Sequence, residues 1–196
     1  TTADVVKLGI AIAAVLSQPA PRTVIVPTTT VQPHFTTEAA QSLGIKEMVS
    51  TFTTHHPCCA PRVTNIHTIA KIVNGAIVMP GATFSVNKFV GPRDTKRGFV
   101  LAPMIEDGLF EDSVGGGISQ FATTLYNAVF FAGIKDITHQ PHSYYISRYP
   151  AGREATVSYP EPNLIFQNNE PTAIVITTSY TGTSLTVTFW GTKYYD

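Results

Sequence analysis

Hydrophobic residues recur at the spacing of a helix in three long stretches of the chain. These are Thr1–Ser17, Thr64–Asn74 and Ile118–Phe131, and a shorter helix is expected at 36–44. In each long stretch the apolar positions fall three or four residues apart and share one helix face. They are Val5, Leu8, Ile12 and Val15, then Ile66, Ile69, Ala70 and Val73, and finally Phe121, Leu125, Ala128 and Val129. The third stretch has the clearest pattern, and Gly133 follows it as a helix terminator.

Alternating β-branched and polar residues predict strands elsewhere in the chain. The expected strands are Arg22–Gln32, Met48–Thr54, Phe99–Ile105, Ala155–Tyr159, Leu164–Gln167, Ala173–Tyr180 and Ser184–Trp190. The last two are joined by Thr181-Gly182-Thr183, a tight connection that is typical of a β-hairpin. Helices and strands are interspersed, but strands follow one another at the end of the chain. The sequence therefore predicts an α+β fold with a C-terminal antiparallel β meander.

The character of the sequence changes between residues 44 and 45. One long helix and one strand come before this point, and they are too few to bury a core by themselves. Residues 1–44 are therefore interpreted as a short appendage, and residues 45–196 as a single compact domain. A chain of 196 residues is long enough to form such a domain.

Composition narrows the classes of protein to which the chain can belong. Hydrophobic residues make up 43% and charged residues 13%, which excludes a disordered chain. The 13 basic and 13 acidic residues cancel, so the chain lacks the cationic footprint expected for nucleic acid or an anionic membrane surface. No stretch reaches the ~18–20 apolar residues of a spanning helix. We therefore expect membrane attachment only through an anchor outside this stretch of sequence.

Three consecutive glycines, Gly115, Gly116 and Gly117, precede the clearest predicted helix. Glycines at such a place allow positive φ and a close approach of the backbone to another group. The free N–H groups of the helix start suit an anion, and Ser119 and Gln120 lie in the same field. A nucleophile at Ser119 would be activated there. The alternative is that the glycines only allow tight packing, with Ser119 as the helix cap.

A second group of polar residues follows that helix. His142 could act as a base, and Glu154 could orient it. Arg148 and Arg153 could clamp a carboxylate through paired N–H donors. The alternatives are a histidine that makes only structural hydrogen bonds and surface ion pairs that contribute little stability.

Two histidines and two cysteines are crowded into His55-His56-Pro57-Cys58-Cys59. Tetrahedral zinc sites normally draw their ligands from two separated pairs, so this spacing argues against a metal site. Adjacent cysteines can instead form a local disulfide or pair with a partner elsewhere. The sequence thus predicts no metal and no cofactor, and it leaves a Cys58–Cys59 disulfide or inert thiols as alternatives.

Several separated motifs run through the compact domain. They are Ser50–Thr54, Arg62–Ile66, Val78–Asn87, Val90–Arg93, Gly115–Asn127 and Pro141–Ser143. In this order they resemble VanW-like domains, a family named after a protein of a vancomycin-resistance cluster. Residues 119–124, 145–150 and 152–156 look like the actinobacterial branch of that family. The segment before residue 45 is similar to the tail of a peptidoglycan-binding repeat that often precedes these domains.

The resemblance implies an extracytoplasmic protein that is associated with the cell wall or anchored in the membrane. Many VanW-like sequences carry Cys where this chain has Ser119, and the order Cys, His, acid is similar to papain-like and transglutaminase-like enzymes. Mapped onto this chain, the trio is Ser119, His142 and Glu154, with Gln120 or the loop amides as an oxyanion site. A Ser hydroxyl is a weak nucleophile without an adjacent base, so the loss of Cys favours binding over catalysis.

The leading hypothesis is a domain that binds peptidoglycan or its stem peptide at the glycine loop. The residues expected to contact this ligand are Gly115, Gly116, Gly117, Gln120, Arg93, Arg148 and Arg153. The second hypothesis is a hydrolase or acyl-transferase that acts on a cell-wall amide through Ser119, His142 and Glu154. The third is a structural module that positions neighbouring wall-binding domains, with a loop that serves packing only.

Overall fold

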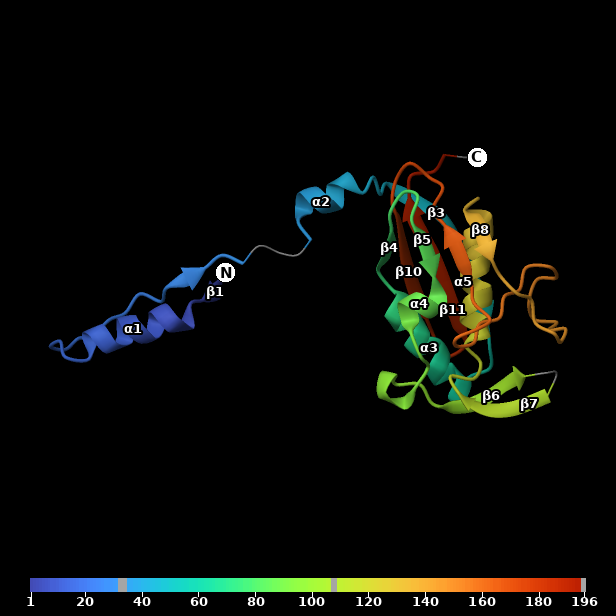
Figure 1. The fold of residues 1–196 in the computed structure, drawn as a ribbon, viewed down its shortest axis with the longest axis horizontal. Coiled ribbons are helices and arrows are strands. Elements are labelled where there is room, and N and C mark those ends of the chain that lie inside the picture. The colour runs from blue at the N-terminus through green and yellow to red at the C-terminus, as the bar shows by residue number, and fades with distance from the viewer. Residues whose placement is uncertain (32–34, 107–108, 195–196) are drawn as a thin grey trace. The chain divides into compact units, whose positions relative to one another are not determined.

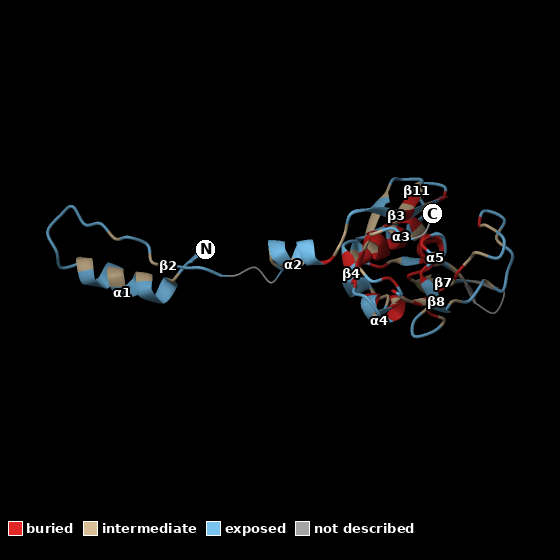
Figure 2. Cartoon of the chain, turned by 90° about the horizontal axis from the view of Figure 1, so that it is seen from above, coloured by how far each residue is buried: buried red, intermediate tan, exposed pale blue. Residues whose placement is uncertain are grey.

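The computed structural model describes residues 1–31, 35–106 and 109–194, which belong to two units, Thr1–Ser42 and Leu43–Asp196. The second unit combines helices with several antiparallel sheets, so the predicted α+β class is confirmed. Buried residues are confined to this unit among the described residues (Figure 2). No described helix has the length and hydropathy needed to cross a lipid bilayer.

The first unit consists of short elements on which no described residue is buried. Strand β1 (Thr2–Ala3) pairs with β2 (Thr28–Thr29), and helix α1 (Val5–Val15) lies between them in the chain. Helix α2 (Thr37–Ser42) follows. The strand predicted over Arg22–Gln32 is therefore wrong except at β2, because β1 is too short to pair with more of it; Gln32 itself lies outside the described residues. The assignment of this unit to a peptidoglycan-binding repeat stays a prediction.

The second unit is built on a four-stranded antiparallel sheet. Its order is β3 (Glu47–His55), β11 (Ser184–Gly191), β10 (Ile174–Tyr180) and β4 (Ala76–Val78). The predicted hairpin is confirmed, since β10 and β11 pair directly from Val175↔Trp190 to Tyr180↔Leu185. Alternate residues of these strands enter the core, namely Ile174, Ile176, Leu185, Val187 and Phe189. The intervening threonines pair across the other face, as Thr53 does with Thr186.

Two amphipathic helices cover the apolar face of this sheet (Figure 1). Helix α3 (Pro61–Val73) packs on β10, and helix α5 (Ser119–Phe131) packs on β3 and β11. Both were predicted, and the apolar faces expected for them are buried. The α5–β3 contact also contains polar pairs, because the Thr54 and Thr124 hydroxyls lie 2.7 Å apart.

A smaller sheet completes the core beside these helices. Its order is β5 (Thr83–Ser85), β9 (Ile165–Gln167) and β8 (Lys135–Thr138), and helix α4 (Val86–Val90) follows β5 directly. Phe166 of β9 lies against Phe189 of β11, with ring centroids 5.8 Å apart, which joins the two sheets. The strand β9 thus belongs to a different sheet from the β10–β11 hairpin.

The strand predicted at Ala155–Tyr159 is wrong, although its alternation correctly places Ala155 and Val157 in the core. Among the described residues no strand pairs with it, and its backbone bonds go elsewhere. The Ala155 amide donates to the Thr123 hydroxyl on α5, and the Thr156 amide donates to the Gln140 carbonyl. The segment is therefore extended but anchored to a helix and a loop.

A hairpin leads into the glycine loop. The predicted strand at Phe99–Ile105 is observed as β6 (Leu101–Glu106), which pairs with β7 (Leu109–Val114). A short 3₁₀ helix, η1 (Thr95–Arg97), lies before β6. The end of β7 runs directly into Gly115, and α5 begins four residues later at Ser119. The hairpin and the two long helices thereby fix the position of the loop.

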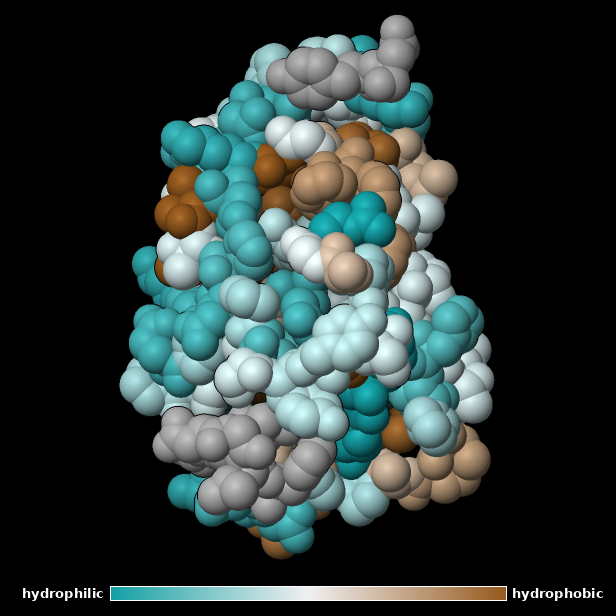
Figure 3. Space-filling view, turned by 90° about the vertical axis from the view of Figure 1, so that its right-hand side faces the viewer, coloured by the Kyte–Doolittle hydropathy of each residue, from teal (hydrophilic) through white to brown (hydrophobic). Residues whose placement is uncertain are grey.

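Hydrophobic side chains also remain exposed at the end of α5 and on β8. Phe130 and Phe131 are each 52% exposed, and Ile137 is 47% exposed. On the face of the molecule shown in Figure 3, hydrophobic residues gather in the upper part and hydrophilic residues dominate below.

Candidate functional site

Each glycine of the loop occupies a position that has no room for a side chain. Gly115 and Gly117 have φ of 92° and 85°, the left-handed region that favours glycine. At Gly116 a Cβ would lie 1.9 Å from the carbonyl oxygen of Ala102. At Gly117 it would lie 2.6 Å from Cβ of Arg62. Tight packing, one of the two interpretations of the glycines, is therefore part of their role.

The loop also leaves backbone donors unpaired at the start of α5. The amide of Gly115 donates to the Val100 carbonyl, and that of Gly116 donates to the Ser113 carbonyl. Within the described parts of the chain, the amides of residues 117, 118 and 119 have no hydrogen-bond partner. Ser119 is not the helix cap, because Ile118 takes that position. The helix start thus keeps free N–H groups of the kind that suit an anion.

A cavity of about 520 Å³ opens at this loop. Its lining includes the loop, Ser119, Gln120, His142 and the hydroxyl-bearing residues Tyr149, Thr156, Ser158 and Tyr159. Arg62, Arg93 and Arg148 also line it. The structure therefore brings together most of the residues that the sequence singled out, from three separate parts of the chain.

Arg62 is a cavity residue that the sequence analysis did not select. Its guanidinium donates to Oε1 of Gln120 at 2.7 Å. The amide of Gln120 is fully buried, and its Nε2 donates to the Thr54 hydroxyl and the His55 carbonyl. Gln120 therefore positions Arg62 rather than offering its amide to a ligand. Burial and the nearby charge of Arg148 lower the pKa of Arg62.

Arg93 is held by neutral acceptors alone. Its two terminal nitrogens donate to the Gly91 carbonyl and to Oδ1 of Asn87, at 2.8 and 2.6 Å. Its Nε is buried and has no hydrogen-bond partner among the described residues, and the guanidinium lies 5.9 Å from the ring centre of Tyr159. Burial lowers the pKa of Arg93 to about 10, so the group stays cationic at neutral pH. A half-buried guanidinium at a cavity wall can receive an anionic ligand.

Arg148 lies at the cavity and Arg153 does not. The guanidinium of Arg148 covers the ring of Tyr149 at 4.8 Å and donates weakly to its hydroxyl at 3.4 Å. That of Arg153 instead covers Phe130 and Phe131, at 5.4 and 4.8 Å from the ring centres. Cation–π attraction at the end of α5 therefore draws Arg153 away from the site predicted for it.

No arginine of the described residues forms an ion pair with a carboxylate. The described cavity lining contains no carboxylate, and Glu154, which lies next to it, is bound to His142. Among the described residues the lining therefore carries three guanidinium charges and no carboxylate charge. Such a site favours a negatively charged ligand.

His142 and Glu154 form the hydrogen-bonded pair that their order along the sequence suggested. Nδ1 of His142 lies 2.9 Å from Oε2 of Glu154, and both side chains are largely buried. The imidazole also stacks on Tyr149, with ring centres 5.8 Å apart. Burial lowers the pKa of His142, and the charge of Arg148 adds to this, while Glu154 opposes it. His142 is therefore neutral at pH 7.

Ser119 lies in the same cavity but has other partners. Its hydroxyl lies 2.9 Å from the Thr156 hydroxyl and accepts a hydrogen bond from the Val157 amide at 3.4 Å. Among the described residues, no histidine bonds to Ser119. Within the expected catalytic trio, His142 and Glu154 are thus bonded to each other, whereas Ser119 is separate from them. In the described part of the chain, no general base contacts the Ser119 hydroxyl.

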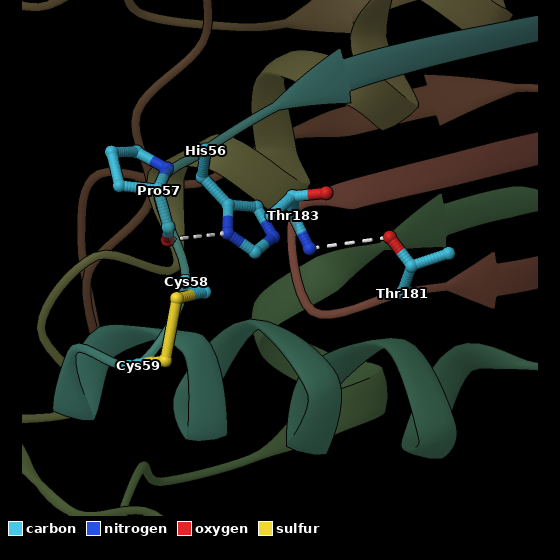
Figure 4. Close-up of a disulfide and its surroundings, with 6 residues drawn as sticks. All are labelled: His56, Pro57, Cys58, Cys59, Thr181 and Thr183. Carbon is cyan, nitrogen blue, oxygen red and sulfur yellow. Dashed lines mark hydrogen bonds between the residues drawn. A yellow bond between two sulfur atoms is a disulfide. The ribbon is translucent and has the colours of Figure 1, made fainter.

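Cys58 and Cys59 form a disulfide in the connection between β3 and α3 (Figure 4). Beside them His56 is buried, and its Nδ1 lies 3.0 Å from the Pro57 carbonyl oxygen. Arg62 follows the disulfide by three residues, in the first turn of α3. In the part of the chain that the structure describes, no three His, Cys, Asp or Glu side chains are grouped so that they could hold a metal ion.

Known proteins are similar to this chain over most of its second unit. The family described as VanW like protein matches residues 61–190. The YoaR protein of Bacillus subtilis (strain 168) is 32% identical over 170 residues, which make up 87% of this chain and 56% of YoaR. The chain thus spans little more than half the length of that relative. No solved structure matches it.

Proposed function

The chain belongs to the VanW family, which relates it to the cell envelope, and we propose that its second unit binds the stem peptide of peptidoglycan. In this proposal the binding site is the cavity at the glycine loop, and the groups recognised are carboxylates of the peptide. The observation that carries the proposal is the set of three cavity arginines, Arg62, Arg93 and Arg148, which lack an ion-pair partner among the described residues.

A ligand carboxylate would satisfy these groups better than water in a partly enclosed cavity. Hydrogen bonds to a charged group contribute about 1.5–3 kcal/mol each, roughly twice as much as bonds between neutral groups. The unpaired amides of residues 117–119 add donors at the positive end of α5. The exposed ring of Tyr159 offers surface for the apolar parts of the same ligand.

The proposal places the unit outside the cytoplasm, where it would face the wall. The Cys58–Cys59 disulfide supports this location, because disulfides persist in oxidising compartments and are rare in the cytosol. The first unit would then belong to a neighbouring peptidoglycan-binding repeat, as its sequence suggests.

The test is calorimetric titration with a synthetic stem peptide that carries its free carboxylates. We expect binding that weakens by tenfold or more in Arg93→Gln, because one charge-assisted contact is lost. Arg153→Gln is the matched control, since this arginine lies over Phe130 and Phe131 outside the cavity lining, and it should bind as the wild type does. Equal loss in both variants, or no binding by the wild type, would contradict the proposal.

A second candidate function is hydrolysis or acyl transfer at a cell-wall amide. The observation in its favour is the His142–Glu154 pair at 2.9 Å, which lies at the same cavity as Ser119. Against it, the Ser119 hydroxyl is bonded to Thr156 and Val157. Covalent labelling by a fluorophosphonate, absent in Ser119→Ala, would favour this function over binding alone. We expect no labelling, because the serine lacks a base in contact.

A further inference from the structure

The cationic groups of the cavity form two clusters, one on each side of the glycine loop. The first, the Arg62 cluster, contains Arg62, Arg148 and Tyr149. Arg62 and Arg148 both interact with Tyr149, and each charge acts on the other. The second, the Arg93 cluster, contains Arg93 and Tyr159. The cavity lining therefore presents positive charge at two places rather than one.

The loop itself keeps the two clusters apart. Gly117 packs against the stem of Arg62, where a Cβ would lie 2.6 Å from Cβ of that arginine. Gly115 packs in the same way against the stem of Arg93, at 2.7 Å. The two guanidiniums then turn to different anchors, Arg62 to Gln120 and Arg93 to Asn87. A single carboxylate on one cluster would leave the other without a partner.

Both clusters carry charge that no described carboxylate balances. Arg93 donates only to neutral acceptors among the described residues, the Gly91 carbonyl and Oδ1 of Asn87. Arg148 makes one weak bond at 3.4 Å to Tyr149. Burial lowers the pKa of Arg62, and the nearby charge of Arg148 lowers it further, so the two charges disfavour each other. An anion between these two arginines would relieve that repulsion.

The cavity lining also contains polar groups that carry no charge. They are the amides of residues 117–119, which have no partner among the described residues, and the hydroxyls of Ser119 and Thr156, which bond to each other at 2.9 Å. Groups of this kind pair with amides or hydroxyls of a ligand. The middle of the ligand is thus expected to be a peptide-like segment.

We infer that the ligand is a short peptide with two separated carboxylates, one bound by the Arg62 cluster and the other by the Arg93 cluster. This inference rests on the proposed function and narrows its ligand class. It explains why the cavity holds arginines on both sides of the loop, and why the loop between them needs glycines that bring the backbone close to both stems.

The experiment uses the full chain and four versions of one synthetic stem peptide: both carboxylates free, each one amidated in turn, and both amidated. Calorimetric titration gives Kd for each version. We expect each single amidation to weaken binding by roughly tenfold, and both together by roughly a hundredfold, because each removes one charge-assisted contact. Two variants, Arg93→Gln and Arg148→Gln, then assign the carboxylates to the clusters.

In Arg93→Gln one of the two amidations should no longer change Kd, and in Arg148→Gln the other amidation should no longer change Kd. Arg148→Gln is preferred to a change of Arg62, because Arg62 is bonded to the buried Gln120. Unchanged thermal unfolding midpoints show that both variants fold. If only one amidation weakens binding, or both respond to the same variant, the two-carboxylate inference is wrong while the proposed function stands. If no version binds the wild type, the proposed function is wrong, and the inference fails with it.

Discussion

At the scale of single residues, each of the three loop glycines packs against a different neighbour. Gly115 and Gly117 lie against the stems of two arginines, whereas Gly116 lies against the backbone of β6 at Ala102. A side chain at either outer position would displace an arginine from the cavity. A side chain at the middle position would displace the hairpin strand instead. The loop thus couples the positions of both clusters to that of the hairpin.

Gly116→Ala tests this packing directly. The added Cβ would lie 1.9 Å from the Ala102 carbonyl oxygen, and backbone cannot move as a flexible side chain can. We expect the free energy of unfolding to fall by about 3 kcal/mol or more, as overpacking in a tight site does. Urea unfolding measures it. Gly182→Ala is the control, because nothing lies within 4 Å of its added Cβ and the change should stay within ~0.5 kcal/mol.

His142 predicts a dependence of stability on pH. Burial holds its folded pKa below the unfolded value of 6.5, so between these two values the unfolded chain binds more protons. Stability should therefore be full above pH 6.5 and should fall as pH drops below it. Burial also lowers the pKa of His56, which adds to the same slope.

The check is urea unfolding of wild type, His142→Gln and His56→Gln at several pH values between 5 and 7.5. Each variant should lose less stability on acidification than the wild type, because one of the two buried neutral histidines is gone. A wild-type stability that rises as pH falls, or slopes identical in all three proteins, would contradict this account. Titration of the His142 ring by NMR gives the folded pKa independently.

At the scale of elements, α5 organises the cavity with buried polar side chains on an otherwise apolar helix. Gln120 anchors Arg62, and Thr123 exchanges hydrogen bonds with the backbone of Ala155. Asn127 donates to the Arg153 carbonyl. One helix thus fixes both the first turn of α3 and the segment that carries Glu154 and Thr156. Buried polar groups are costly unless they are hydrogen-bonded, so these bonds are needed for the fold as well as for the site.

The disulfide in the connection between β3 and α3 should contribute little to global stability. Cys58 and Cys59 are adjacent, so the bond closes the shortest loop that a chain allows, and the entropic effect is about 1 kcal/mol. We expect the double change Cys58→Ser with Cys59→Ser to lower the free energy of unfolding by about that amount. Urea unfolding of both proteins, without reductant, measures the difference. A loss of several kcal/mol would mean that this short connection organises the start of α3.

The elements that could be predicted from the sequence are those in which the spacing of hydrophobic residues matches the secondary structure. Helices α3 and α5 and the β10–β11 hairpin have an apolar face that matches their structure. Strand β8 was missed because all its residues are exposed, which leaves no alternation to detect. The segment at 155–159 has the alternation of a strand but no strand beside it.

The candidate site was predictable in part for a similar reason. The glycine run and the His142–Glu154 pair lie in short motifs that carry their own chemistry. Arg62 was missed because its role depends on Gln120, which lies 58 positions further along the chain. Arg153 was assigned to the site because the sequence does not reveal which aromatic rings its guanidinium will meet.

At the scale of the whole molecule, a neutral chain contains a locally cationic site. The net charge of 0 argues against a broad basic surface, but it carries no information about one cavity. Three arginines line it, no described lining residue is a carboxylate, and the nearby Glu154 is bound to His142. Low-dielectric walls concentrate the field of such charges on a ligand that enters. A net charge of 0 over the whole chain is therefore compatible with a cationic cavity.

The division into two units gives the last prediction, which concerns stability alone. Every buried hydrophobic residue among those described lies between Leu43 and Phe189, and none of the described residues before Leu43 is buried. Residues 43–196 produced alone should therefore unfold cooperatively, with a midpoint within about 2–4 °C of that of the full chain, which corresponds to less than ~1 kcal/mol. Calorimetry of both proteins measures the two midpoints. A much lower midpoint for the shorter chain would mean that residues 1–42 stabilise the domain through contacts beyond its core.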